Sequence, residues 1–507
     1  MPTDTTTPTA GDSPSLLPSG TRGSKPGLVS LCLGFGLLVV CLVGLFTSPT
    51  AAVAGVWCVG MMLVLLFLSV PVALALAIPS LVGIYAISGT AAAVNVFSTS
   101  PYESVSNWSL SVLPMFIFMG MLLTSSGMTA KIYRATERWF AWLPGGIGVG
   151  TTAAGAGLAS VSGSTIGMTY ALGRAGIPEM LKAGYDKRMA VGIVLVSGLP
   201  GNLIPPSILL VVYAGIASVP VGPQLMAGAV PGILIALFFA VFVMVLGTLR
   251  PSLVGRGQDR AEAEEVTWKM RFQSLGEVWG FPLIMVVLFG GIFSGVFTPT
   301  EAGAGAALVS LLLLLFYARK DKPFRTLTKA AFETVASTAA IFFIIIGAEM
   351  LTKLMAITGL AQMVTGSITD LGLPRWGFLM MLVVLYVFLG MFLDTLSMML
   401  LTIPILLPTI DAMGVSSLWF GVFVVLLGEV AMITPPVGIL SYIVHNIAKS
   451  SEVNVGHDIT LKDIFTSLLW FLPIVVLFLI IMIAIPEMTE WLPGLLEETT
   501  GGDAATA

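Results

Sequence analysis

Residues 200–210, PGNLIPPSILL, interrupt a long apolar segment with a glycine, an asparagine and two adjacent prolines. Proline has no backbone N–H and its ring clashes with the preceding turn, so Pro205 and Pro206 predict a break in a membrane-type helix. A second break of the same kind is predicted at residues 430–440, VAMITPPVGIL. Because unwound backbone in lipid has no water to pair with, such a break persists where it lines a cavity or coordinates a ligand.

The composition indicates a polytopic membrane protein. Apolar residues make up 56% of the 507 residues, and charged residues only 10%, against roughly 25% in soluble domains. The mean hydropathy is +0.99. Apolar runs of about 20 residues, each long enough to cross a hydrocarbon core of ~30 Å, recur along the chain. We therefore expect the lipid bilayer as a partner, and no nucleic acid.

Several function classes are disfavoured by what the sequence lacks. The three cysteines (Cys32, Cys41 and Cys58) lie in or beside apolar runs, which predicts buried thiols rather than disulfides. The two histidines, with no CxxC or HExxH spacing, argue against a transition-metal site. No Walker A pattern is present, and no nucleophile–base pair marks an intramembrane enzyme. We expect no enzymatic activity; a channel is conceivable but fits the features below less well.

The predicted fold is all-α, with about eleven transmembrane helices and two re-entrant hairpins. The hairpins, at about 143–182 and 376–411, enter the membrane and return to the same side. Residues 1–26 predict a disordered cytoplasmic tail, and residues 27–50 predict an extra transmembrane helix rather than a signal peptide. The predicted crossings are 28–47, 52–70, 72–92, 110–127, 186–217, 225–249, 281–298, 300–317, 330–356, 416–446 and 463–486.

The positive charges support this threading. With the N-terminus in the cytoplasm, as Arg22 and Lys25 suggest, Lys353 and Arg375 are the only basic residues left near the outside face. This is a strong positive-inside asymmetry, and it places residues 491–507 in the periplasm as a tail. The clusters that fall inside are 131–138, 182–188, 250–271 and 319–329, with Lys449 and Lys462.

The two breaks belong to an internal repeat. A shift of 230 residues aligns the halves without gaps, and the matches concentrate at structural residues: Thr165 with Thr395, Met168 with Met398, Pro178 with Pro408, Gly184 with Gly414, Gly198 with Gly428, and Pro205 and Pro206 with Pro435 and Pro436. In the predicted threading the repeats, 51–275 and 276–490, have inverted topology. This is typical of transporters whose sites lie at the midplane between broken elements.

The hairpin tips suggest what the breaks bind. The first tip is SVSGST (160–165), and the second is GMFLDTLS (390–397), which contains Asp394 within an apolar run. Carbonyls freed at a break can point at a cation such as sodium, and helix N-termini at a tip attract an anion. Each tip with its following break predicts one of two pseudo-equivalent ion sites.

Each feature also has a structural explanation. A single proline pair can be a simple kink, and the serines and threonines of the first tip can serve helix packing. Asp394 is a functional candidate by default because it is an intramembrane carboxylate. Glu429, one turn before the second break, is a candidate site residue, a structural cap or a proton site.

Two other polar features point to the membrane interface rather than to a site. Arg174 lies about nine residues past the first tip, roughly 13 Å along a helix, so we expect it to snorkel toward the headgroups. Trp139 and Trp142, in KIYRATERWFAWLPGG, predict an amphipathic interfacial helix.

At these positions the chain resembles the large membrane (permease) subunit of the tripartite ATP-independent periplasmic (TRAP) transporters. The similarity extends over most of residues 55 to 490. The matching stretches are SGSTIGMTYALGRAGIPEMLKAGYD (162–186), IPPSILLVVYAG (204–215), FTPTEAGA (297–304), FLDTLSMMLLTIPILLP (392–408) and ITPPVGIL (433–440).

The resemblance implies a secondary importer of the bacterial inner membrane, driven by a sodium gradient, with an elevator motion as in the ion transporter superfamily. It implies an organic-anion substrate, a small membrane subunit and a periplasmic substrate-binding protein. Carried onto this sequence, the sodium-binding residues are Ser162, Gly163, Ser164, Gly198, Gly201, Ile204 and Pro205 in one site and Asp394, Thr395, Thr434 and Pro435 in the other. The expected substrate-binding residues are Thr165, Asn202, Ser397 and Glu429.

Two features depart from the family pattern. The helix at 27–50 precedes the usual start of the large subunit and is too short to be a complete small subunit. The segment GLPGNLIPP is richer in Pro and Asn than is common, so Asn202 is a candidate for tuning substrate or ion binding. The alternative function is a stand-alone sodium-coupled anion symporter that needs no binding protein.

Overall fold

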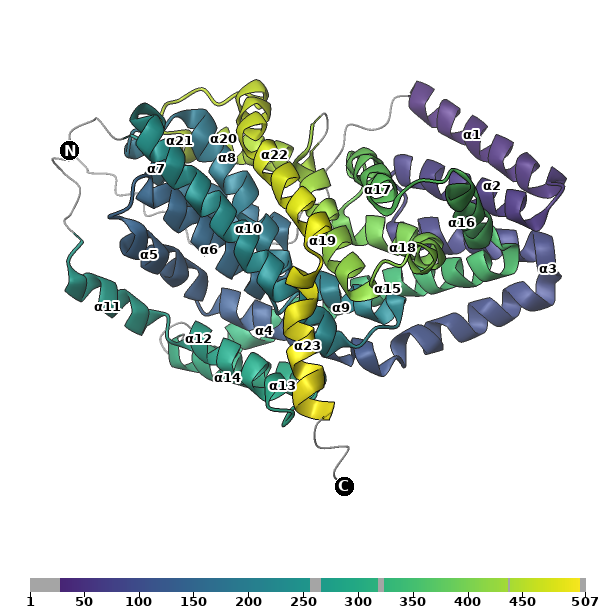
Figure 1. Ribbon diagram of the computed structural model, residues 1–507, viewed down its shortest axis with the longest axis horizontal. Helices are drawn as coiled ribbons and strands as arrows, with labels where there is room; N and C mark the ends of the chain where they lie inside the picture. The colour runs from purple at the N-terminus through teal and green to yellow at the C-terminus, as the bar shows by residue number, and fades with distance from the viewer. Residues whose placement is uncertain (1–27, 256–265, 318–322, 436–437, 502–507) are drawn as a thin grey trace, which may run out of the picture.

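The protein is seen in a computed structural model that describes residues 28–255, 266–317, 323–435 and 438–501. This part of the chain is helical, with a single isolated bridge between Tyr185 and Val254 (Figure 1). The predicted all-α class is confirmed. The predicted tail at 1–26 and the residue Pro436 lie outside the described residues.

The first half of the chain contains the first hairpin and the first break. Its elements are α1 (Leu28–Thr47), α2 (Ala51–Phe67), α3 (Val72–Val105), η1 (Trp108–Ser111), α4 (Val112–Ser125), α5 (Met128–Phe140), α6 (Gly146–Ser162), α7 (Thr165–Lys182), α8 (Lys187–Ser197), η2 (Leu199–Asn202), α9 (Ile208–Ala217), α10 (Val221–Leu249) and η3 (Pro251–Leu253). We call α6–α9, residues 146–217, the first unit.

The second half contains the second hairpin and the second break. Its elements are α11 (Trp268–Glu277), α12 (Gly280–Met285), η4 (Val286–Gly290), α13 (Gly291–Phe293), α14 (Pro299–Tyr317), α15 (Pro323–Thr358), α16 (Leu360–Asp370), α17 (Arg375–Leu389), α18 (Thr395–Ala412), α19 (Ser417–Ile433), α20 (Ile439–Ala448), α21 (Ser451–Asn454), α22 (Leu461–Ala484) and α23 (Glu487–Gly501). We call α17–α20, residues 375–448, the second unit.

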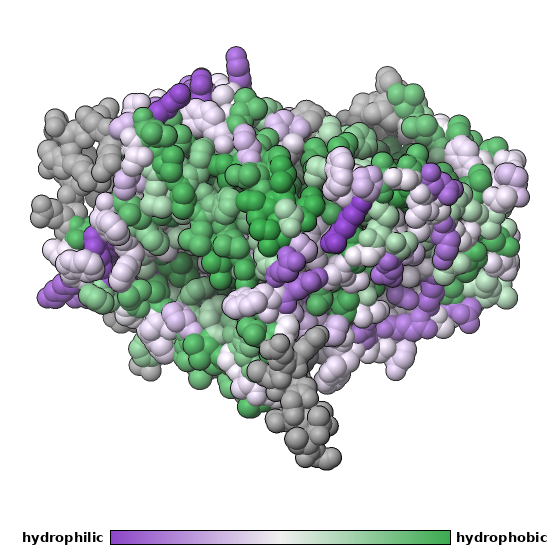
Figure 2. All heavy atoms as spheres, in the orientation of Figure 1, coloured by the Kyte–Doolittle hydropathy of each residue, from purple (hydrophilic) through white to green (hydrophobic). Residues whose placement is uncertain are grey.

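Among the described residues, seven helices are long and apolar enough to cross a membrane, or eight if the bent α11–α13 segment counts as one span. The predicted eleven crossings also count the shorter α1 and α2 and the two interrupted helices. Many large apolar side chains stay exposed on the outside of the molecule, as expected for a surface that faces lipid, and Figure 2 shows them over a wide area of one face.

The tip of the first hairpin is a tight turn that requires glycine. Gly163 has a φ of 60°, and a Cβ at this position would lie 2.4 Å from the Ile208 side chain at the start of α9. Ser164 then caps α7 by accepting a hydrogen bond from the Gly167 N–H at 3.2 Å. The turn therefore fixes where the return helix of the hairpin begins.

The first break is a short 3-10 turn followed by extended backbone. The Gly201 N–H donates to the Gly198 carbonyl at 3.1 Å, and the Pro200 carbonyl accepts from Leu203 and Ile204. The Ser207 hydroxyl donates to the Asn202 carbonyl. The peptide between Pro205 and Pro206 is cis. Side-chain and backbone donors thus replace the helical hydrogen bonds that the prolines remove.

The second break lies between α19 and α20. Thr434 ends α19 in extended conformation, and its hydroxyl donates to the Val430 carbonyl at 2.7 Å. Gly438, with a φ of 46°, begins α20, and the Ser441 hydroxyl donates to the Ile433 carbonyl at 3.3 Å across the break. Both interrupted helices therefore break close to where the proline pairs predict.

Outside the two units, long helices pack side by side. The helices α3 and α15 run along each other, and α14 packs against α4 (Figure 1). Gly347 on α15 permits the close approach, because a Cβ there would lie 2.6 Å from the Ala73 carbonyl oxygen. The predicted crossing at 72–92 is longer than expected: α3 continues to Val105 through a kink at Gly89, whose φ is 80°.

The C-terminal segment differs from its prediction as a plain tail. Residues 487–501 form α23, which packs against α10 and α19. The helix begins with Glu487 and Glu490 in its first turn, where acidic side chains favour a helix N-terminus. The sequence predicts only the periplasmic location of residues 491–507, from their lack of basic residues, and not this helix.

Candidate functional site

Four polar side chains from both halves of the chain meet at the centre of the molecule. They are Thr165, Asn202, Thr395 and Glu429, and each is at most 5% exposed. Thr165 is the first residue of α7 and Thr395 the first of α18, so each stands directly after a hairpin tip. Asn202 lies in the first break, and Glu429 is in the last turns of α19 before the second break.

The carboxylate of Glu429 is the centre of this cluster. Its Oε2 accepts a hydrogen bond from the Thr165 hydroxyl at 2.7 Å. Its Oε1 accepts from the Asn202 amide at 2.8 Å and from the Thr395 hydroxyl at 3.1 Å. Asn202 donates a second hydrogen bond to the Thr165 hydroxyl oxygen. One buried side chain is therefore bonded to both hairpins and to the first break.

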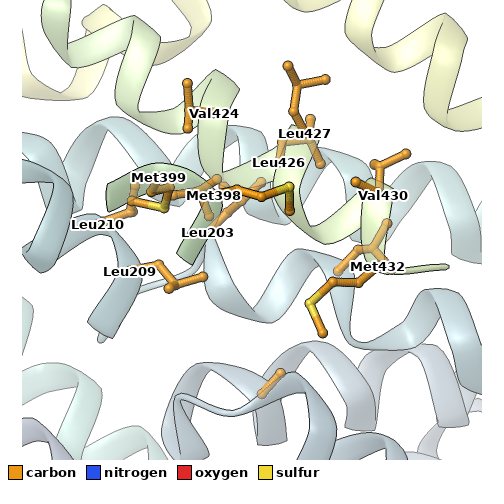
Figure 3. Close-up of a cluster of buried hydrophobic side chains, with 14 of the residues drawn as sticks. Leu203, Leu209, Leu210, Met398, Met399, Val424, Leu426, Leu427, Val430 and Met432 are labelled. Atoms are coloured by element: carbon orange, nitrogen blue, oxygen red, sulfur yellow. The ribbon is translucent and has the colours of Figure 1, made fainter. Parts of the chain in front are cut away.

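The surroundings of the cluster are apolar. Figure 3 shows Leu203, Leu209 and Leu210 near the first break together with Met398 and Met399 of α18 and side chains of α19. Burying a carboxylate in such surroundings is costly unless hydrogen bonds compensate for lost water. The three donors to Glu429 provide that compensation, and Thr165 is the one donor to Oε2, so its removal leaves that oxygen unpaired.

The internal repeat reappears as matching contacts. A Cβ at Gly198 would lie 3.0 Å from Thr165, and one at Gly428 would lie 2.4 Å from Thr395. In both units, therefore, a glycine occupies the point where the interrupted helix passes the first residue of the hairpin's second helix, α7 or α18.

A second contact matches in position but not in residue type. In the first unit Thr165 is bonded to Asn202, and at the equivalent positions the Thr395 hydroxyl contacts the Met432 sulfur at 3.2 Å. The position equivalent to Glu429 is Leu199. The packing is therefore duplicated, whereas the carboxylate is present once.

A family model for the DctM component of tripartite ATP-independent periplasmic transporters matches residues 59–488 of the chain. This chain belongs to the DctM family of TRAP transporters. The match covers both units and all four residues of the cluster, and it begins after α1. As a member of this family, the permease is a transport protein and not an enzyme.

Curated relatives support the assignment over most of their length. The permease is 30% identical over 458 residues to the C4-dicarboxylate TRAP transporter large permease protein DctM of Vibrio cholerae, covering 86% of this chain and 96% of that one. It is 29% identical over 388 residues to the sialic acid TRAP transporter large permease protein SiaM of the same organism, covering 76% and 87%.

Among solved structures, the permease is similar in fold to the Alcanivorax borkumensis YdaH transporter, whose crystal structure is described as having an unusual topology. The TM-score is 0.58 at 14% sequence identity, and the match covers 89% of this chain and 99% of the other. At this identity the likeness concerns the fold alone.

The predicted sodium residues of the first unit fall into two places. Ser162, Gly163 and Ser164 form the tip, where Ser164 is exposed and Ser162 and Gly163 are half-buried. Gly198 and Gly201 are buried behind the tip, against Thr165 and against Ala159 and Ser160. Ile204 is half-buried and Pro205 is buried in the break, where Gly232 of α10 lies close to Ile204.

The predicted residues of the second unit divide in the same way. Asp394 caps α18 at the tip and accepts a hydrogen bond from the Ser397 hydroxyl, so Ser397 is bonded to Asp394 rather than to Glu429. Asp394 is half-exposed, not fully enclosed in its apolar run as its neighbours suggest. Thr434 and Pro435 are half-buried at the break. Thr395 lies in the buried cluster instead of at the tip surface.

The sequence predicts the members of the cluster but not their association. Thr165, Asn202 and Glu429 are predicted together as substrate residues and Thr395 as a sodium residue; the structure instead joins these four and leaves Ser397 outside. The one sequence feature that pointed to the Asn202–Glu429 contact was the presence of Asn202 in a segment where asparagine is uncommon in the family. Arg174, as expected from its position, is exposed and stands 5.4 Å from the Tyr170 ring.

Proposed function

We propose that this permease is the transport subunit of a secondary active importer in the bacterial inner membrane, with its N-terminus in the cytoplasm and its C-terminus in the periplasm. It uses an inward sodium gradient to move an organic anion that carries a carboxylate. A periplasmic substrate-binding protein delivers the anion, and a small membrane subunit binds the long helices outside the two units. Relatives named for C4-dicarboxylates and for sialic acid support an organic-acid substrate.

The observation that supports sodium most directly is a charge balance. Asp394 and Glu429 lie at the second tip and in the central cluster, and neither belongs to any of the five ion pairs among the described residues. A buried or half-buried carboxylate without a basic partner is costly unless a cation compensates for it. Sodium prefers oxygen ligands, which the tips and breaks supply as hydroxyls, carbonyls and the Asp394 carboxylate.

The central cluster also supports an elevator motion. Glu429 is bonded to both return helices and to the first break, so the two units are joined by buried hydrogen bonds. The long helix α15 runs along α3 and packs against α18 of the second unit, which makes α15 the surface past which the units would slide. In the proposed motion the two units move as one body, carrying both tips and the substrate past the long helices.

The test is uptake of radiolabelled carboxylates into proteoliposomes that contain the permease and its co-encoded small subunit. Uptake is measured with and without an inward sodium gradient, and with and without the binding protein. We expect uptake only when both are present. Uptake with sodium alone would indicate a stand-alone symporter, and uptake that ignores sodium would overturn the proposed coupling.

A further inference from the structure

The hydrogen-bond partners around Glu429 are all groups that can donate to it. The Asn202 NH₂ group can only donate, and it donates to Glu429 and to the Thr165 oxygen. The Thr165 hydroxyl accepts from Asn202 and passes its own hydrogen to Glu429. With Thr395, three groups that can donate surround the carboxylate. This arrangement fits an ionised, acceptor-only Glu429.

Two helix N-termini also converge on this carboxylate. Thr165 and Thr395 are the first residues of two 18-residue helices, α7 and α18, and both side chains are bonded to Glu429. A helix N-terminus carries about +0.5 of an elementary charge. The negative charge of Glu429 therefore offsets about the whole positive charge that the two return helices bring to the tips.

The sum of these charges decides whether an anion can bind unaided. Two helix N-termini contribute about +1 and the carboxylates of Glu429 and Asp394 contribute −2, which leaves about −1 before any ligand arrives. A carboxylate substrate entering this site alone would meet net repulsion. Without Glu429, the sum would be about zero, so the anion would no longer meet net repulsion at the helix N-termini.

We propose that Glu429 is the residue that makes anion binding conditional on sodium. It acts as a fixed negative charge, held out of contact with solvent at 1% exposure, that cancels the attraction of the two helix N-termini for the anion. Sodium must enter to restore that attraction. This inference rests on the proposed sodium-driven transport, and it assigns the coupling to a charge behind the ion sites, not to a sodium ligand.

The repeat supports a role for the charge beyond packing. At the equivalent position of the first unit, Leu199 is fully buried, so an apolar side chain satisfies the same place in the fold. The fold therefore does not require a carboxylate at this position in each repeat. One carboxylate placed where both return helices begin acts on both of them.

The experiment measures the sodium concentration that gives half-maximal uptake by the reconstituted permease, with its small subunit and binding protein present. Glu429→Gln keeps the size of the side chain and removes its charge; its amide oxygen can still accept from Asn202 and Thr395, while its NH₂ group donates to the Thr165 oxygen. We expect the half-saturating sodium concentration to fall by about tenfold, with measurable uptake in sodium-free choline buffer. An unchanged sodium dependence with a lower maximal rate would overturn the proposal, because that result indicates a structural role.

Two further variants separate charge from structure. Asn202→Asp combined with Glu429→Gln moves the charge across a 2.8 Å hydrogen bond, and it is expected to restore a wild-type sodium requirement. Asn202→Leu removes two hydrogen bonds but keeps the charge, so it is expected to lower the amount of folded permease without lowering the half-saturating sodium concentration.

If Glu429→Gln does not accumulate in the membrane, Glu429→Leu, which places the residue of the equivalent position Leu199 there, removes the same charge. We expect the half-saturating sodium concentration to fall in this variant as well; an unchanged value would overturn the proposal. Sodium-independent uptake by the wild-type permease would instead refute the proposed function itself. Sodium-dependent wild-type uptake with an unchanged Glu429→Gln requirement would refute only the role of Glu429.

Discussion

The first and second units share one plan but are built from different side chains. In the first unit the entering helix α6, GIGVGTTAAGAGLASVS, is rich in glycine and alanine and almost completely buried between its neighbours. In the second unit the entering helix α17, RWGFLMMLVVLYVFL, is built of large apolar residues and exposes Trp376, Val384 and Phe388. One entering helix is enclosed in protein, and the other presents a broad apolar face outward.

The two tips also differ: the first carries a neutral serine where the second carries a carboxylate. Ser164 and Asp394 occupy equivalent positions, and each accepts a hydrogen bond from the residue three places on: from the Gly167 N–H in the first tip and from the Ser397 hydroxyl in the second. The two units thus share the position of the N-cap residue and the glycine contacts, but only Ser164 caps its helix through a backbone N–H, and both carboxylates lie in the second unit. The shared contacts build the fold, and the differences supply the chemistry.

The largest expected effect tests the difference at the tips. We predict that Asp394→Ala abolishes uptake while leaving expression intact, because it removes the charged oxygens at the proposed second ion site. Ser164→Ala, at the equivalent position, removes a neutral cap and is expected to cost about 1 kcal/mol of stability and to reduce uptake only partly. Uptake assays beside size-exclusion profiles of the purified variants check both.

Asp394→Asn is the matched control for that comparison. It preserves the size of the side chain and an acceptor for Ser397, but it carries no charge. Loss of uptake in this variant would assign the effect to the charge, and wild-type uptake by a well-folded Asp394→Ala protein would remove Asp394 from the site.

A second prediction concerns the glycine contacts that the units share. A Cβ at Gly390 would lie 2.2 Å from the Ala431 Cβ, so Gly390→Ala is expected to cost about 1–3 kcal/mol of stability. In the first unit the equivalent pair is Ser160 and Gly201, so the glycine there stands at the position that corresponds to Ala431. We therefore expect Ala431→Gly to recover much of the loss in the double variant, measured as the midpoint of thermal unfolding.

The corresponding exchange in the first unit provides the contrast. A Cβ at Gly201 would lie 2.1 Å from the Cβ of Ala159. The exchange that corresponds to Ala431→Gly is Ser160→Gly combined with Gly201→Ala, and it leaves Ala159 unchanged. Gly201→Ala should therefore stay destabilised in the Ser160→Gly background. If the second substitution restored stability equally in both units, the Gly390–Ala431 and Ser160–Gly201 contacts would be equivalent, and the prediction would be wrong.

A third prediction compares the two threonines of the cluster. Thr165→Val leaves Glu429 Oε2 without its donor and removes the acceptor of Asn202, so we expect a loss of about 1–3 kcal/mol. Thr395→Val removes a longer bond to Oε1, which Asn202 still satisfies, and should cost about 1 kcal/mol. Thermal unfolding of both variants, with the matching serine substitutions as controls, measures the two losses of stability. A larger loss in Thr395→Val than in Thr165→Val would contradict the prediction.

The smallest expected effect concerns Arg174 of the first unit, whose equivalent in the second unit is Pro404. Arg174 is exposed and lies beside the Tyr170 ring, so a long cation of either kind can fill its role. We predict that Arg174→Lys keeps uptake within about twofold of wild type. Complete loss in a folded variant would indicate direct binding of the anion by the guanidinium group.

Much of the architecture could be predicted from local sequence. The proline pairs define both breaks, and SVSGST with a glycine at its turn defines the first tip, because proline and glycine act through their own backbones. The repeat offset of 230 residues then relates the two halves. The kink at Gly89 and the helix α23 could not be predicted in the same way, because packing against distant helices stabilises them.

The site was predicted less completely, for a physical reason. Which polar groups pair depends on contacts between residues 165, 202, 395 and 429, which are far apart in sequence, and no periodicity in either half reports such a contact. Sequence reasoning therefore separated substrate residues from sodium residues by motif, whereas the structure groups them by burial: Thr165, Asn202, Thr395 and Glu429 inside, Ser164 and Asp394 at the tips.

The helix α15 has a further consequence, which concerns the thickness of the membrane. Its 36 residues rise about 54 Å, well beyond a hydrocarbon core of ~30 Å. Lys329 near its start is paired with Glu333 and Lys353 near its end with Glu103 of α3, and a helix of this length must incline or extend past the hydrocarbon core. The helix α3 runs along it, so lipids beside the two helices must stretch or shorten to match them. The bilayer around this permease is therefore shaped by the protein, and acyl-chain length becomes one of the conditions under which it works.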